Sequence, residues 1–163
     1  MREESNEKRR PPSVPRRNLF RPDGPLVSEI GFGAWPIGGG LGPVERDLGI
    51  ATVKAAVRLG LSFIDTADYY ENAPAYESKT NQQGGSETAI GVALKEDAAL
   101  AAEAFVTTKV SKMPHSAEQI RERCAASLRT LQMDVIPLYQ LHFYDESVPI
   151  QERMGALQAR REE

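Results

Sequence analysis

Four ionisable side chains of four different types follow apolar segments of this chain, and together they are suited to proton transfer. In chain order they are Asp65, Tyr70, Lys109 and His142. A buried phenol donates a proton near neutral pH if a neighbouring cation lowers its pKa, and Lys109 is a candidate cation for Tyr70. Asp65 would hold the ammonium group in place, and His142 would orient or polarise a carbonyl oxygen.

Each of these residues taken alone also has an ordinary structural explanation. An aspartate after a strand often caps a turn, and a lysine at the end of a strand is usually solvated. A histidine inside the stretch QLHF is often a hydrogen-bonded core residue. The interpretation as a site therefore depends on all four residues lying at the same edge of one sheet.

Short apolar segments alternate with amphipathic segments along the chain. Strands are expected within residues 25–35, 61–67, 104–110 and 135–143. Helices are expected within residues 45–60, 86–96, 116–132 and 146–163. Ile120 and Cys124 lie on one face of the third helix, where Ser116 and Gln119 fit a capping box, and Ser86 is a candidate N-cap of the second.

The strict alternation of strand and helix predicts an α/β fold with a parallel sheet joined by right-handed crossovers. In such folds the carboxyl ends of the strands share one rim, and the chemistry is found there. Four strand-helix units are half of a TIM (β/α)8 barrel, and 163 residues fall short of the roughly 250 that the closed barrel needs. The count alone leaves an open doubly wound sheet and an incomplete barrel as alternatives.

The composition is that of a globular protein, with 40% apolar and 26% charged residues. A net charge of −3 provides no basic surface for nucleic acid, and no apolar run reaches the roughly 18 residues of a membrane span. Cys124 is the only cysteine, so we expect neither an internal disulfide nor a thiolate zinc site. We therefore expect a cytoplasmic protein without a metal, nucleic acid or membrane partner.

Residues 1–17 differ from the rest of the chain. They contain the basic stretch KRRPPSVPRR after three glutamates and lack the apolar region of a secretory signal. We expect a disordered, solvated basic arm, and the alternative is a contact with the nuclear-import machinery or with an anionic surface.

Five motifs in the correct order resemble the aldo-keto reductase family. They are LVSEIGFGAWPIGG, FIDTADYY, SETAIG, FVTTKV and SLRTLQMDVIPLYQLHFYD. The resemblance covers residues 18 to about 160. It implies the N-terminal half of a (β/α)8 barrel and an oxidoreductase that uses NADP(H) to reduce an aldehyde or ketone to an alcohol.

The resemblance also implies roles for individual residues. The proton donor falls on Tyr70, five residues after Asp65, and Tyr69 is the alternative to be excluded. The lysine of the family falls on Lys109 and its histidine on His142. With Asp65, these residues form the expected catalytic set.

The expected cofactor contacts lie at the first strand. Gly33, Ala34 and Trp35 resemble the family segment that approaches the nicotinamide and the substrate, and Asp65 is expected beside them. Trp35 has the alternative of packing in the core. A Rossmann dinucleotide site in GFGAWP is excluded because Pro36 stands where the motif requires a glycine.

Three features depart from the family pattern. The later units that build the phosphate site of (β/α)8 barrels do not follow. Residues 71–85 form a longer loop than the family usually has, and Pro137 occupies a strand position where the family commonly has aspartate. A proline there belongs at a sheet edge or a bulge.

A half barrel would have two open strand edges, which favour association. We expect either an incomplete gene product of low stability or a homodimer that rebuilds a closed barrel. The corresponding alternative function is a catalytically inactive, reductase-like fragment that acts as an interaction or regulatory protein.

Overall fold

The structure is a computed structural model that describes residues 14–71 and 85–162. Its strands are β1 (Arg16–Asn18), β2 (Leu26–Ser28), β3 (Phe32–Gly33), β4 (Phe63–Asp65), β5 (Phe105–Val110) and β6 (Leu138–Leu141). Its α-helices are α1 (Arg46–Arg58), α2 (Ser86–Lys95), α3 (Ala98–Glu103), α4 (Ala117–Leu131) and α5 (Ile150–Glu162). Two 3-10 helices are η1 (Pro36–Gly38) and η2 (Asp68–Glu71).

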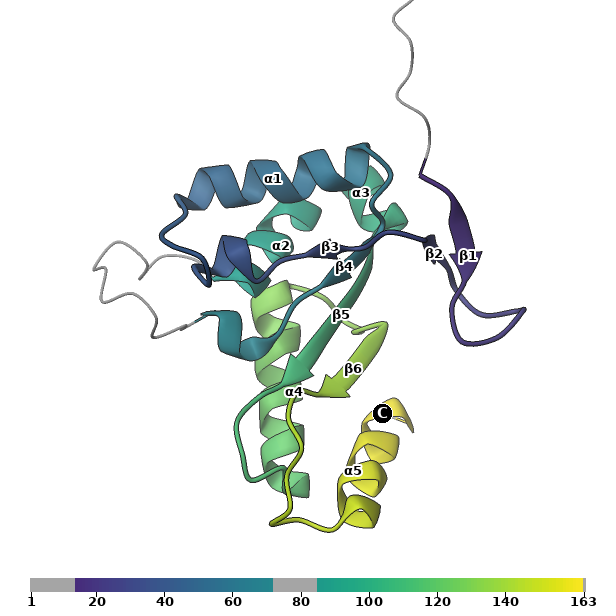
Figure 1. Cartoon of the computed structure of the whole chain (residues 1–163), viewed down its shortest axis with the longest axis vertical. Helices are drawn as coiled ribbons and strands as arrows, with labels where there is room; N and C mark the ends of the chain where they lie inside the picture. Colours follow the sequence, from purple (N-terminus) through teal and green to yellow (C-terminus); the bar gives the residue numbers. More distant parts are fainter. Residues whose placement is uncertain (1–13, 72–84, 163) are drawn as a thin grey trace, which may run out of the picture.

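A parallel sheet in the order β3-β4-β5-β6 carries the fold, as the alternation of strands and helices predicts. Asp65 lies beside both Gly33 and Thr107 in the register, and Lys109 lies beside Gln140. Helix α1 packs on α2, α2 on α4, and α4 on α5, so the helices follow the strand order (Figure 1). The carboxyl ends of all four strands therefore meet at one rim.

The core lies between the sheet and the first helices. Val53 from α1, Ile90 from α2, Ile64 from β4 and Val106 from β5 are all fully buried in one cluster. Burying an aliphatic side chain of this kind stabilises a fold by about 1.5–3 kcal/mol. This apolar layer packs the strands against the helices and so fixes the position of the sheet.

Helices α2 and α4 approach each other closely at Gly91. A Cβ atom added there would lie 2.6 Å from the carbonyl oxygen of Thr130 and 2.8 Å from the backbone of Leu131. Only a glycine leaves room for the backbone of α4 at this point. The close packing holds α2 against the helix that precedes β6.

The single strand predicted within residues 25–35 is wrong, because the chain forms two short strands there. Strand β2 pairs with β1 in an antiparallel hairpin, and β3 joins the parallel sheet (Figure 1). The side chain of Ser28 forms hydrogen bonds at the point where β2 ends. Its Oγ donates to the carbonyl of Ile30 at 2.8 Å and accepts from the backbone N–H of Phe63 at 3.1 Å.

The boundary of the predicted disordered arm also needs correction. Arg16 and Arg17 belong to β1, where they pair with Ser28 and Val27. Pairing with β2 gives these residues regular backbone hydrogen bonds in place of solvent. Residues 1–13 of the predicted arm lie outside the described residues, as do residues 72–84 of the predicted 71–85 loop.

The helix starts follow the predictions in part. Ser116 caps α4, where its Oγ accepts from the N–H of Gln119 at 3.3 Å, but Gln119 Oε1 has no hydrogen-bond partner in the described residues. Gly85, not Ser86, is the N-cap of α2. Ser86 is already the first helical residue, and its buried hydroxyl lies 2.7 Å from the Oγ1 of Thr66.

Helix α3 was not predicted. It is six residues long, and Asp97 caps it by accepting a hydrogen bond from the N–H of Leu100 at 3.3 Å. Five of its six residues are apolar, so no alternation of apolar and polar residues marks the helix in the sequence. Pro137 directly precedes β6, so it costs that strand no internal hydrogen bond.

Strands β3 and β6 form the two edges of the four-stranded sheet. Association through these edges, and hence the homodimer, stays a prediction. Across residues 14–71 and 85–162, no helix has the length and apolar character needed to cross a bilayer.

Candidate active site

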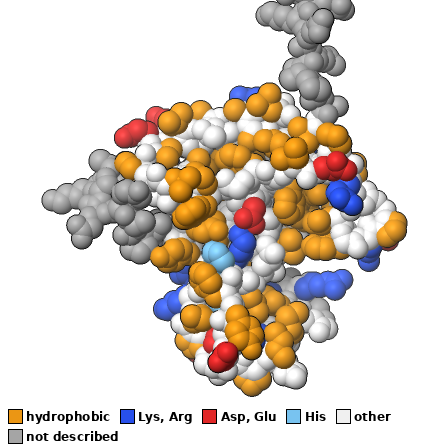
Figure 2. Space-filling view, viewed as in Figure 1, with side chains coloured by type: hydrophobic (Ala, Val, Ile, Leu, Met, Phe, Trp, Pro, Cys, Tyr) orange, Lys and Arg blue, Asp and Glu red, His pale blue; other side chains and the backbone are white. Residues whose placement is uncertain are grey.

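The four predicted catalytic residues lie together at the carboxyl rim of the sheet. Asp65 ends β4, Lys109 is the last residue but one of β5, His142 directly follows β6, and Tyr70 lies in η2. Figure 2 shows a histidine, a basic and an acidic side chain next to one another in the middle of one face, surrounded by hydrophobic side chains. Parallel pairing explains this gathering, since it brings equivalent strand ends side by side.

Lys109 is held by two acceptors at the end of the neighbouring strand, one on Asp65 and one on Thr66, which directly follows β4. Its Nζ donates to Asp65 Oδ2 at 2.9 Å and to the carbonyl oxygen of Thr66 at 2.8 Å. The Lys109 side chain is 16% exposed and that of Asp65 is 40% exposed. The predicted contact between the ammonium group and the Asp65 carboxylate is therefore present at the edge of solvent.

Tyr70, and not Tyr69, faces the other predicted site residues. Lys109 Nζ lies 5.4 Å from the centre of the Tyr70 ring, and the rings of Tyr70 and His142 meet edge to face at 5.6 Å. Tyr69 is 43% exposed, and no ring contact found in the described part of the chain joins it to Lys109 or His142.

Tyr70 is positioned by the backbone of η1. A Cβ atom added at Gly38 would lie 2.4 Å from the carbonyl oxygen of Tyr70. The missing side chain at Gly38 thus lets the glycine-rich loop after β3 pack directly on the turn that carries the phenol.

The electrostatic effect on Tyr70 differs from the prediction. Burial, followed by the negative charge of Asp65, raises the pKa of Tyr70 above its ordinary value. The expected lowering of this pKa by Lys109 is wrong, because burial and the Asp65 charge move it in the opposite direction. Tyr70 is therefore protonated at neutral pH, but its raised pKa makes it a weaker acid than the phenol with a lowered pKa that the sequence predicted.

His142 is held on both its backbone and its ring. Its N–H donates to the carbonyl of Val110 at 2.9 Å, and its Nδ1 lies 2.7 Å from the Oγ of Ser111. The ring stacks on Phe143 at 4.4 Å with an angle of 4° between the planes. Burial first, and the charge of Lys109 second, lower the pKa of His142, which favours a neutral ring near pH 7.

Three residues that the sequence analysis did not assign support this rim. Asp68 is 3% exposed, and its two carboxylate oxygens accept from the N–H of Ser111 at 3.0 Å and from Arg123 Nε at 2.7 Å. The signal for Asp68 was a second carboxylate in FIDTADYY, a stretch that is otherwise mostly apolar. Ser111 and Arg123 carry no comparable signal, because their partners are distant in the sequence.

The expected cofactor segment lies next to Asp65. Ala34 is fully buried, and its N–H donates to the carbonyl of Asp65 at 2.8 Å, while a Cβ atom added at Gly33 would meet nothing within 4 Å. Trp35 is 44% exposed, which excludes the alternative that it packs in the core. Gly33, which lies beside Asp65 in the sheet, thus faces open space, and Trp35 is partly exposed to solvent.

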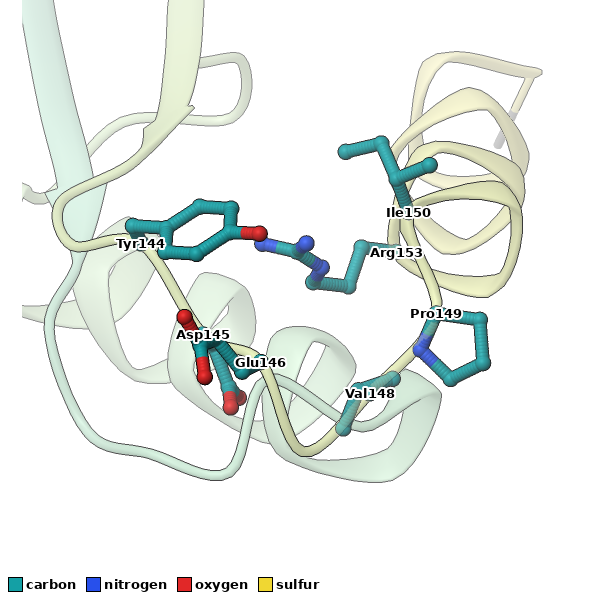
Figure 3. A pocket seen from close by; sticks show the side chains of 7 residues that line it. All are labelled: Tyr144, Asp145, Glu146, Val148, Pro149, Ile150 and Arg153. Carbon is teal, nitrogen blue, oxygen red and sulfur yellow. The ribbon is translucent and has the colours of Figure 1, made fainter.

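A separate hollow of about 510 Å³ lies between the segment after β6 and the start of α5. Its lining residues are Tyr144, Asp145, Glu146, Val148, Pro149, Ile150 and Arg153. Figure 3 shows Tyr144 and Arg153 reaching toward each other across it, and the guanidinium carbon lies 5.6 Å from the centre of the tyrosine ring. One cation and two carboxylates share the lining, so it is not selective for an anion, and it contains none of the four predicted catalytic residues.

Comparison with known proteins places this geometry in a family. Residues 29–163 match the sequence profile of the Aldo/keto reductase family. The chain is 34% identical to L-galactose dehydrogenase of Arabidopsis thaliana, over 84% of this chain and 42% of that protein. It is 37% identical to the aldo-keto reductase YhdN of Bacillus subtilis, over 77% of this chain and 37% of that protein.

Solved structures agree with the sequence relatives. The thermostable aldo-keto reductase Tm1743, bound to the inhibitor epalrestat, superposes with a TM-score of 0.73 at 25% identity, over 91% of this chain and 50% of that one. An aldo-keto reductase of Klebsiella pneumoniae, in complex with NADP and acetate, gives a TM-score of 0.65 at 28% identity, over 82% and 41%.

The chain spans half or less of the length of these proteins. Its four parallel strands therefore correspond to an incomplete barrel, as the motifs predict, and the open doubly wound sheet is set aside. From its profile match, its relatives and its fold, the chain belongs to the aldo/keto reductase family.

Proposed function

We propose that this chain supplies the catalytic rim of a cytoplasmic, NADPH-dependent reductase that converts an aldehyde or a ketone to an alcohol. The observation that carries the proposal is the position of Tyr70. Its ring lies 5.4 Å from Lys109 Nζ and 5.6 Å from the ring of His142. A protonated phenol, an ammonium group and a neutral imidazole thus surround one point where a carbonyl oxygen can bind.

Each residue has a distinct part in the proposed reaction. NADPH, when bound, supplies a hydride to the carbonyl carbon. Tyr70 donates its phenolic proton to the carbonyl oxygen, which completes the alcohol. Lys109, held by Asp65, stabilises the phenolate that remains, and His142 orients the carbonyl oxygen.

The described residues fit the nicotinamide end of the cofactor. Gly33 faces open space and lies beside Asp65 across the β3-β4 pair, and Trp35, two residues later, is 44% exposed. In (β/α)8 barrels the phosphate groups are bound by the loops after the last two strands. We therefore expect the 163-residue chain to bind NADPH more weakly than the longer relatives do.

An assay of NADPH oxidation with a reactive aromatic aldehyde tests the proposal. Tyr70→Phe is expected to lower the rate at least about 100-fold, because a general acid contributes a factor of that order or more. Tyr69→Phe is the matched control and is expected to retain the rate, since Tyr69 is 43% exposed. Equal turnover by wild type and Tyr70→Phe would contradict the assigned role.

The open edges favour a second candidate, an interaction or regulatory protein without turnover. Strands β3 and β6 end the sheet on either side and have unpaired backbone groups for another chain to bind. Native mass and NADPH fluorescence separate the two functions. A dimer that enhances NADPH fluorescence supports the reductase, and a monomer without enhancement supports the interaction protein.

A further inference from the structure

We propose that Ser111 is a positioning residue that places the ring proton of His142 on Nε2, the nitrogen that does not face Ser111. The catalytic consequence rests on the proposed function, because it gives His142 an N–H with which to bind a carbonyl oxygen beside Tyr70. The positioning itself is a property of the rim and can be measured without turnover.

Two neighbouring strands bring Ser111 and His142 together. Ser111 directly follows β5 and His142 directly follows β6, after the paired residues Val110 and Leu141. The His142 N–H donates to the carbonyl of Val110 at 2.9 Å, which fixes the backbone. The Ser111 Oγ then lies 2.7 Å from His142 Nδ1, so the pairing of the strands also brings these two side chains within hydrogen-bond distance.

The surroundings of Ser111 decide which atom is the donor. Ser111 is 7% exposed, and its hydroxyl has no hydrogen bond within the described residues other than the one to His142. If Nδ1 carried the proton, the buried hydroxyl hydrogen would have no acceptor, which is costly. If the hydroxyl donates to Nδ1, both groups are satisfied and the ring proton lies on Nε2.

The position of Ser111 is itself fixed by a buried carboxylate. Asp68 Oδ1 accepts from the N–H of Ser111 at 3.0 Å, and Asp68 Oδ2 accepts from Arg123 Nε at 2.7 Å. Asp68 begins η2, the same short helix that carries Tyr70. One carboxylate therefore ties the loop that orients His142 to the helix that holds the predicted proton donor.

The charges around His142 are consistent with a neutral ring. Lys109, Asp68, Asp65 and His115 all act on it. Burial and the positive charge of Lys109 outweigh the two carboxylates, so the pKa of His142 lies below its ordinary value. A neutral ring carries its proton on one nitrogen, and the bond from Ser111 selects that nitrogen.

Imidazole NMR of the 163-residue chain tests the proposal, because the chain contains only two histidines. Protein labelled with ¹⁵N-histidine reports the tautomer of each ring, and His142→Gln identifies the signals of His142. We expect the Nε2–H form in the wild type. Ser111→Ala is expected to yield a mixture of both tautomers and to raise the pKa of His142 by about one-half to one pH unit, since the neutral form loses its donor.

Two further variants separate positioning from a general structural effect. Ser111→Thr keeps the hydroxyl and is expected to restore the wild-type tautomer and pKa. Ser127→Ala removes a buried hydroxyl without a hydrogen-bond partner in the described chain and is expected to leave His142 unchanged.

The direction in which the pKa of His142 changes in Ser111→Ala distinguishes the two possible donors. If Nδ1 were the donor to Ser111, the alanine variant would lower the pKa of His142, because the charged ring would lose its acceptor. An Nδ1–H tautomer in the wild type, or a pKa that falls or stays the same in Ser111→Ala, overturns the proposal. If neither the wild type nor any variant reduces an aldehyde, but the tautomers are the expected ones, the proposed function is refuted and the positioning role of Ser111 still holds.

Discussion

Lys109 Nζ donates a hydrogen bond of 2.9 Å to Asp65 Oδ2 across two neighbouring strands. The phenol of Tyr70 lies near this pair, but its pKa does not follow the expectation based on a neighbouring cation. The carboxylate offsets the charge of the ammonium group and, after burial, is the second cause that raises the pKa of Tyr70.

Replacement of Asp65 by asparagine is expected to lower the pKa of Tyr70. The change removes a negative charge that disfavours the phenolate and leaves Lys109 without its carboxylate partner. Ultraviolet titration of the phenolate, with Tyr70→Phe subtracted to remove the other tyrosines, measures this pKa. Asp23→Asn, in an exposed ion pair with Arg21, is the control. An unchanged or higher pKa in Asp65→Asn would show that the carboxylate does not act on Tyr70.

Loss of Arg123 is expected to destabilise the fold. Arg123→Met leaves one oxygen of the buried Asp68 carboxylate without its donor, which costs about 1–3 kcal/mol of unfolding free energy. Urea unfolding followed by circular dichroism measures the difference. Arg58→Met is the matched control, since the Arg58 side chain is 60% exposed in its ion pair with Asp97 and its loss should change the midpoint little. Similar midpoints for the two variants would mean that the Asp68 contact adds no stability.

The stability of the protein is expected to fall in weak acid partly because of His142. Its pKa is lowered in the folded state, so the unfolded chain binds the proton more readily. The contribution is complete above the ordinary histidine pKa of about 6.5 and is lost as the pH falls below that value. The contribution of His142 is measured by comparing the unfolding free energies of wild type and His142→Gln between about pH 8 and pH 5. His115 is present in both proteins, so its effect cancels. A difference that stays constant with pH would contradict the lowered pKa.

Two helical glycines are expected to respond in opposite ways to alanine. Gly91→Ala places a Cβ atom 2.6 Å from the Thr130 carbonyl and should cost about 1–3 kcal/mol of unfolding free energy through overpacking. Gly155→Ala in α5 meets nothing within 4 Å and should stabilise the protein by up to about 1 kcal/mol. Thermal unfolding of the two variants provides the comparison. Stabilisation by Gly91→Ala would mean that α2 and α4 are not in close contact at this point.

Periodic features of the sequence predicted the sheet and the gathering of the four ionisable residues. Strand β5 is rich in β-branched residues, and alternation with helices places Asp65, Lys109 and His142 at one rim. These properties depend on neighbouring residues and on a general rule of parallel sheets, so a single sequence contains them.

Features that depend on contacts between distant segments were not predictable in the same way. The break after β2 depends on Ser28, whose N–H donates to the Ser62 Oγ at 2.9 Å from 34 residues away. The hydroxyl of Ser86 forms a hydrogen bond with Thr66, 20 residues earlier, and the N-cap of α2 is Gly85. The direction of the pKa change at Tyr70 depends on the burial of the phenol and on its approach to the Asp65 carboxylate, which no spacing in the chain specifies.

The two hydrogen bonds of Asp68 reduce the conformational freedom of the segments that carry Tyr70 and His142. Because Arg123 and the Ser111 N–H each bind one oxygen of this carboxylate, the helix that bears Tyr70 and the loop beside His142 are held together. In the proposed reaction, a carbonyl compound would meet groups already aligned at this rim, and little of its binding energy would be spent on ordering them.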